Sequence, residues 1–193
     1  MMIRFSLCLI IALAFAASAS AESGNWRFAM GYAFLSQADE VKDSIKRLSR
    51  DSGDGGDIYS TSINISFQPY YQFANGWRAG AGVGPLMILM GDSRHFQAPV
   101  NVTLGYSFFK DCDFSAYCRA GLSYHTATGD YYADSDPGLY GAMGMEFFNT
   151  RSAHIGFEAA WDGAEIFLNP APGRTNHKKI RTGELTLFLY ADF

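Results

Sequence analysis

The feature that most constrains this chain is an alternation of period two that recurs in eight separate segments. In each segment, large apolar or aromatic side chains occupy every second position, and small or polar side chains stand between them. The segments are 26–34, 62–73, 77–84, 100–108, 118–125, 139–147, 154–162 and 184–193. Successive side chains of a β-strand point to opposite faces, so this pattern predicts eight strands with one apolar face each.

The connections between these segments are alternately short and long. The short ones are 74–76, the turn between Cys112 and Cys118, and 149–152, and the long ones are 38–57, 91–97, 128–137 and 164–180. This order predicts antiparallel up-and-down strands, with both chain ends on the side of the short turns. One stretch, Leu86 to Met90, is apolar on both faces, and Pro85 before it indicates a bulge or a change of register.

The composition of the two faces indicates which of them meets water. Charged residues are only 18% of the chain. The face formed by the small and polar side chains, called the small face below, carries almost no Lys, whereas a solvated surface carries many. An eight-stranded barrel has an interior that small side chains fill, whereas a continuous apolar exterior in water would exceed what soluble monomers expose. We therefore predict an all-β fold, an eight-stranded antiparallel up-and-down transmembrane β-barrel. A soluble periplasmic barrel that binds an apolar ligand is the alternative.

Aromatic residues cluster at the two ends of the apolar face. A membrane barrel carries such girdles at both membrane interfaces. Those expected near the short turns are Trp26, Phe73, Trp77, Phe108, Phe147 and Phe193, and those expected near the long loops are Tyr32, Phe34, Tyr124 and Trp161.

The N-terminus and the cysteines indicate export. Arg4, the apolar stretch 5–17 and the small residues Ala19-Ser20-Ala21 have the pattern of a cleaved signal peptide, so we expect residues 1–21 to be removed and 22–193 to form the barrel. Cys112 and Cys118 flank a short turn, and in an oxidising compartment this spacing predicts a disulfide.

With these features the chain resembles the small eight-stranded bacterial outer-membrane barrels, such as the OmpA barrel domain and OmpX. The final strand 185–193 carries the most specific part of the resemblance, because Tyr190 and the terminal Phe193 look like the signal that the outer-membrane assembly machinery reads. The resemblance implies a monomer in the outer membrane of a Gram-negative bacterium, in contact with its lipids and lipopolysaccharide. A net charge of −4 does not suggest a nucleic-acid partner.

Charged residues of the small face are expected to lie in the lumen. They are Arg27, Arg78, Arg119, Glu146, Glu158, Glu184 and Asp192. Unpaired charges there would be costly, so we expect pairs, with Arg119 near Glu146 and Arg27 near Asp192. A polar plug that fills a narrow barrel is the favoured interpretation, and a proton or ion path is the alternative.

One alternative function is a lipid-A acyl-modifying enzyme. The palmitoyltransferase family carries an Asp-Ser pair after its third strand, and Asp92 and Ser93 stand at that place here, with His95 close by. The first long loop contains no His, however, and the His-x-Ser motif of the deacylase family is not matched at His125. These three residues are therefore weak catalytic candidates, and the sequence predicts neither a cofactor nor a metal site.

The favoured function is a structural or adhesive role through the extracellular loops. In the first long loop, Val41, Ile45 and Leu48 recur at helical spacing, so an amphipathic helix at the outer surface is an alternative, while the favoured interpretation of this loop and of the last one is a solvated charged loop. The cations available for lipopolysaccharide phosphates are Lys42, Lys46, Arg47 and Arg50 in this loop and Arg174, His177, Lys178, Lys179 and Arg181 in the last one.

Overall fold

The structure is a computed structural model. It describes residues 25–35, 38–51, 53, 58–63, 65–91, 93–109, 111–148, 154–169, 178–181 and 185–192. The expected signal peptide, Asp92, Glu184, Phe193 and parts of the long loops lie outside these ranges.

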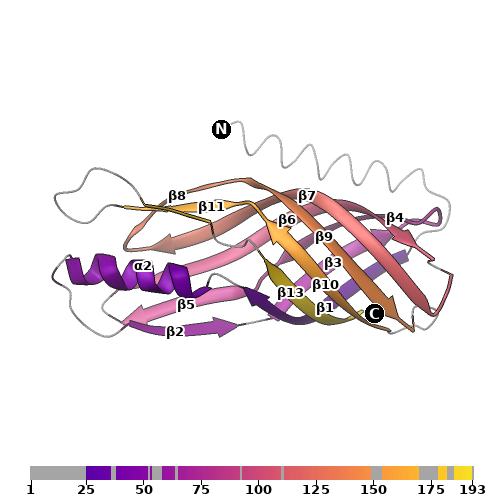
Figure 1. Ribbon diagram of the computed structural model, residues 1–193, viewed down its shortest axis with the longest axis horizontal. Helices are drawn as coiled ribbons and strands as arrows, with labels where there is room; N and C mark the ends of the chain where they lie inside the picture. The colour runs from indigo at the N-terminus through magenta and orange to yellow at the C-terminus, as the bar shows by residue number, and fades with distance from the viewer. Residues whose placement is uncertain are drawn as a thin grey trace.

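Eight antiparallel strands form a closed ring, as predicted (Figure 1). The ring strands are β1 (Asn25–Leu35), β3 (Ile65–Gln72), β4 (Trp77–Val83), β6 (His95–Phe108), β7 (Phe114–Gly129), β9 (Gly138–Phe147), β10 (His154–Asp162) and β13 (Thr186–Asp192). The ring closes because β1 pairs with β3 on one side and with β13, the last strand, on the other.

The large apolar side chains cover the outside of this ring. On β13, Leu187 and Leu189 are 51% and 63% exposed, while Phe188 and Tyr190 between them are buried. On β1, Trp26, Phe28 and Met30 are exposed and Ala29 is buried. A continuous exterior of this kind is stable against acyl chains and not against water, so the predicted inside-out arrangement is confirmed.

Beyond the ring, on the side of the long loops, the strands continue as a separate extension. Here β2 (Ile58–Ile63) pairs with β5 (Leu86–Gly91), which in turn pairs with the first residues of β6. A second sheet has the order β12 (Lys178–Arg181), β11 (Glu165–Leu168), β8 (Tyr132–Asp136). In Figure 1 the labelled strands β2, β5, β8 and β11 of this extension lie at the left end of the molecule, beyond the ring.

The change of register predicted near Pro85 separates β4 from β5. Gly84 adopts a φ of +93°, and a Cβ there would lie 2.4 Å from the backbone oxygen of Ile65. The backbone at position 84 can therefore approach Ile65 this closely only because the residue is Gly. After the break, Met87 and Leu89 point inward and are buried, whereas Met90 is exposed.

The first long loop contains an amphipathic helix, α2 (Ala38–Asp51), so the alternative suggested by the helical spacing is correct and the favoured solvated loop is wrong. Its Val41 and Ile45 are fully buried against Met87, Leu89, Ile166 and Leu168, which belong to β5 and β11. We call these six residues the outer apolar core. Among the described residues, no helix is long and apolar enough to cross a membrane.

The predicted disulfide is wrong, because Cys112 and Cys118 are both free and exposed. The strand after the turn begins already at Phe114, so Cys118 lies inside β7 and not at its start. Its neighbour Tyr117 is buried in the lumen, and the alternation therefore directs Cys118 outward, while Cys112 remains in the turn.

Candidate functional site

The lumen holds two buried ion pairs that join strands across the barrel. Arg78 on β4 donates from Nη1 to Oε1 of Glu146 on β9, at 2.6 Å, and its Nη2 donates to the other carboxylate oxygen. Arg119 on β7 makes a similar two-point contact with Glu158 on β10, through Nε and Nη2 at 2.6 Å each. Bidentate pairs of this kind are the strong form of an arginine–carboxylate contact.

Tyrosine rings pack around both guanidinium groups. The guanidinium carbon of Arg78 lies 4.9 Å from the ring centre of Tyr70 and 4.4 Å from that of Tyr117. The Tyr190 hydroxyl donates to Tyr117 Oη at 3.1 Å and to Glu146 Oε1 at 3.2 Å, and the Tyr117 hydroxyl donates to Glu158 Oε2 at 2.8 Å. The two ion pairs are therefore parts of one network.

A third set of polar side chains lies toward the short turns. Arg27 Nη1 is 3.0 Å from His154 Nδ1, and His154 Nε2 is 3.1 Å from Asp192 Oδ2, to which the Tyr70 hydroxyl also donates. Since Arg27 can only donate, a hydrogen bond between these two side chains requires Nδ1 of His154 to be the acceptor. Glu146, His154 and Asp192 would be close enough to share a metal ion. However, Arg78 already neutralises Glu146, and the Arg27 guanidinium lies against His154, so a metal cation would be placed beside two buried positive charges.

Individual pairs differ from those expected from the sequence. Arg119 binds Glu158 and not Glu146, and Arg27 contacts His154 and not Asp192 directly. The reason is that long side chains reach past the neighbouring strand into the lumen. The tyrosines of the network were not identified from the sequence, although Tyr70 and Tyr190 on the otherwise small face were an available signal.

The network leaves little free space. A cavity of about 20 Å³ lies between the two ion pairs, lined by Tyr70, Arg78, Thr103, Arg119 and Glu158 among others. This volume is enough for about one water molecule. Among the described residues, side chains therefore fill most of the lumen at this level, as the narrow interior of an eight-stranded ring allows.

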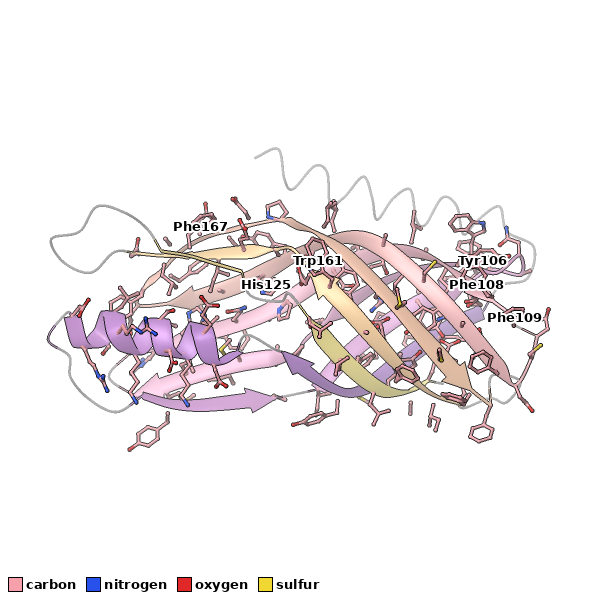
Figure 2. The ribbon with its side chains drawn as sticks, in the orientation of Figure 1. Tyr106, Phe108, Phe109, His125, Trp161 and Phe167 are labelled. Carbon is pink, nitrogen blue, oxygen red and sulfur yellow. The ribbon has the colours of Figure 1, made fainter. Side chains whose placement is uncertain are left out.

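A second chain of hydrogen bonds lies nearer the long loops, beneath the outer apolar core. His125 Nε2 is 3.0 Å from Asp162 Oδ2, its Nδ1 is 2.8 Å from Gln97 Nε2, and Gln97 Oε1 is 3.2 Å from His95 Nε2. Figure 2 shows His125 in the interior, between the strands. Met87 and Leu89 of the outer apolar core pair directly with Gln97 and His95, so the polar chain supports the apolar layer.

The weak catalytic candidates lie in this same interior region. Ser93 and His95 are both buried, and neither Ser93 Oγ nor His95 Nδ1 has a hydrogen-bond partner among the described residues. A nucleophile and its base would be joined by such a bond, so this arrangement lacks the contact that activates a serine. Asp92 lies outside the described residues.

Three solved structures of outer-membrane proteins are similar to this chain in fold. Outer membrane protein W from E. coli matches with a TM-score of 0.54 and 13% identity, over 89% of this chain and 98% of that one. AlkL matches with a TM-score of 0.54 and 10% identity over 90% and 91% of the two chains, and OprG from Pseudomonas aeruginosa with 0.51 and 13% over 88% and 91%.

No protein-family model and no curated protein matches the sequence. At 10–13% identity the likeness to the solved structures concerns the fold alone. Together with the closed eight-stranded ring and the exposed apolar exterior, it establishes that the chain is a small transmembrane β-barrel of the bacterial outer-membrane type.

Proposed function

We propose that this barrel is a non-catalytic surface protein of the outer membrane, whose extracellular extension holds α2 in a fixed position as an interaction surface. The observation that supports this most is the outer apolar core, in which Val41, Ile45, Ile166 and Leu168 are at most 1% exposed. A barrel that only had to cross the bilayer would need no such core beyond its spanning strands.

Strand length supports an extracellular position for this core. β7 has 16 residues, whereas about 9–11 tilted residues cross the hydrocarbon layer. The last residues of β7 and the β5, β8 and β11 segments beside them therefore extend above the bilayer. The filled lumen supports the same function, because polar solutes have no open path past the Arg78 and Arg119 ion pairs.

The exposed face of α2 fits a phosphate-bearing partner. Asp39 and Glu40 occupy the first turn, near the barrel, while Arg47 and Arg50 are exposed in the second half, which extends away from it (Figure 1). This order complements the helix dipole and places cations at the outer end. Arginine binds phosphate through two parallel hydrogen bonds, so we infer that the partner is the phosphorylated part of lipopolysaccharide.

Charge reversal on α2 tests this function. The double variant Arg47→Glu, Arg50→Glu is expected to bind lipopolysaccharide about three- to tenfold more weakly, because two exposed arginines that attract phosphate are replaced by carboxylates that repel it. The measurement is titration of the protein in lipid nanodiscs with the phosphorylated core oligosaccharide. Asp43→Asn on the same helix is the matched control and should not weaken binding. Equal affinity for the dephosphorylated oligosaccharide would show that the partner is not a phosphate.

A gap in the extension supports a second candidate function. Within the described ranges, β2 pairs only with β5 and β12 only with β11, and α2 follows β1 at the place where a strand of the wall is missing. If α2 moved aside, the outer apolar core would open sideways above the filled lumen. Such an opening would give apolar small molecules a route from the surface into the membrane.

Undocking α2 separates the two candidates. Ile45→Asp places a charge in the outer apolar core and is expected to release the helix, because a buried unpaired carboxylate is strongly unfavourable. Under the first function, lipopolysaccharide binding then falls and uptake of an apolar dye by whole cells does not change. Under the second, dye uptake accelerates. Proteolysis within 38–51 checks that the helix is released, and Asp43→Asn serves again as the control.

A further inference from the structure

His95 is a buried histidine of the extension with one ring nitrogen that lacks a hydrogen-bond partner. It is the first residue of β6, and it pairs with Leu89 of β5 and with Gly129, the last residue of β7. About 9–11 tilted residues cross the hydrocarbon layer, counted from Phe108 at the short-turn end of β6, so His95 lies beyond the membrane-spanning part of this strand. The side chain is buried, and its Nδ1 has no partner among the described residues.

The hydrogen bonds around His95 fit a neutral imidazole ring. The amide nitrogen of Gln97 can only donate, so it binds the unprotonated Nδ1 of His125, at 2.8 Å. The amide oxygen of Gln97 can only accept, so it binds the N–H at Nε2 of His95, at 3.2 Å. Figure 2 shows His125 in the interior of the molecule, between the strands. For a neutral His95, Nδ1 is then an unprotonated nitrogen, which does not require an acceptor.

A second proton on His95 would have no acceptor in this position. The residue directly opposite on β5 is Leu89, which belongs with Val41 and Ile45 of α2 to the outer apolar core. Rotation of the Gln97 amide would not help, because it would turn a donor toward a ring that itself only donates when protonated. Burial therefore lowers the pKa of His95 below its ordinary value, and the hydrogen bond to Gln97 opposes this only in part.

The charged groups nearby do not compensate such a proton. Asp162, at the far end of the hydrogen-bonded chain, already accepts from Ser123 and lies against His125. On the elements around His95, the charged side chains are exposed or half-buried; they are Asp39, Glu40, Lys42, Asp43, Lys46, Arg47, Arg50 and Asp51 on α2, Arg94 before β6, Asp130 after β7, Asp134 and Asp136 on β8, and Glu165 on β11. Within the described part of the chain, none of these forms an ion pair with His95. A charged His95 would therefore be a buried charge without a partner.

α2 is the part of this layer that can leave without breaking a sheet. The strands β5, β7 and β11 are each held by backbone ladders to their neighbours. Between α2 and the strands, by contrast, no backbone hydrogen bond is present in the described ranges. The helix is attached through the side chains of the outer apolar core, so its release is the opening that gives water access to His95 while every ladder stays intact.

We propose that the extension is an acid-operated switch, in which protonation of His95 beneath the outer apolar core releases α2 from the strands. This inference goes beyond the proposed function, because it concerns the conditions under which α2 is docked and not the partner that α2 binds. The docked state keeps His95 neutral, whereas in the released state water solvates the ring and its pKa returns to about 6.5.

The direction of the pH dependence follows from this difference. The released state binds more protons than the docked state, so docking weakens as the pH falls below about 6.5, while above about pH 7.5 His95 is neutral in both states and contributes nothing. For one such group, the ratio of released to docked helix rises about tenfold between pH 7.5 and pH 5.5.

The reaction rate of a buried thiol on α2 tests this proposal. Ser44 is 2% exposed, and S44C in a C112S, C118S chain places a single thiol beneath the helix. The protein in lipid nanodiscs is treated with a dipyridyl disulfide, which also reacts with thiols in acid, and each rate is divided by that of the same cysteine in a peptide of residues 38–51. We expect this normalised rate to rise about tenfold from pH 7.5 to pH 5.5. S66C, at a buried position of β3, is the matched control and should not respond.

Two histidine variants show whether His95 is the group that titrates. In the S44C chain, His95→Gln is expected to abolish the rise, because glutamine cannot be protonated, whereas His154→Gln, which removes a buried histidine at the other end of the lumen, should retain it. A normalised rate that does not change with pH in the S44C chain overturns the proposal without any further variant. A rise that persists in His95→Gln, or that is lost in His154→Gln, overturns it as well.

Discussion

Replacing Glu146 with alanine is expected to destabilise the folded barrel by about 3–5 kcal/mol, because it leaves the buried Arg78 charge without its partner. Arg78 is 7% exposed and is enclosed by the rings of Tyr70 and Tyr117, so water cannot take the place of the carboxylate. Tyr190 loses one of its two acceptors in the same change and keeps Tyr117 Oη. The free energy of unfolding in lipid vesicles, measured from urea titrations with tryptophan fluorescence, gives the result directly.

A double variant distinguishes the effect of the unpaired Arg78 charge from the effect of the lost side-chain packing. Arg78→Met with Glu146→Leu removes both charges and keeps most of the volume, and it is expected to recover most of the stability lost in Glu146→Ala. If Glu146→Ala unfolded at the same urea concentration as the unchanged chain, the bidentate contact between Arg78 and Glu146 would be wrong.

Replacing Leu189 with arginine is expected to destabilise the barrel by about 2–4 kcal/mol in a bilayer, which is the usual effect of a cation on the lipid face near the midplane. Leu189 lies in the middle of β13 and is 63% exposed, so in water the same change would be nearly neutral. The unfolding free energy in vesicles is again the measurement.

Tyr59→Arg is the matched control for this change. Tyr59 is 69% exposed but belongs to β2, in the extension above the bilayer. We expect its replacement to change the stability by no more than about 0.5 kcal/mol. Similar small effects at both positions would place the exterior in water and support the soluble barrel instead.

The barrel wall was predictable because its signal is local. The alternation determines which side chains share a face of each strand, and the composition of each face determines which of them meets lipid. The number of strands and the direction in which their side chains point therefore follow from the sequence. The disulfide prediction failed because it depended on where β7 begins, and the sequence predicted that boundary later than Phe114.

Contacts across the lumen were not predictable from the same signal. Arg78 and Glu146 come from β4 and β9, which have β6 and β7 between them in the ring, so no pairing rule joins them. The outer apolar core combines Ile45 of α2 with Met87 from the segment of unclear phase and Ile166 from an expected loop. Helical spacing indicated α2 only as an alternative to a solvated loop, because the burial that stabilises its apolar face depends on packing partners that are distant in the sequence.

The adjacency of β1 and β13 has a consequence for how the chain assembles. Until the last strand arrives, β1 and β10 each present an open edge whose backbone groups have no partners in lipid. β13 also carries Asp192, whose carboxylate accepts a hydrogen bond from the Tyr70 hydroxyl and lies beside His154. The pairing of β13 therefore closes the wall and completes the interior network in the same step. A chain without β13 would have neither the closed wall nor the complete network. A shift of β13 by one residue would turn Asp192 toward the acyl chains.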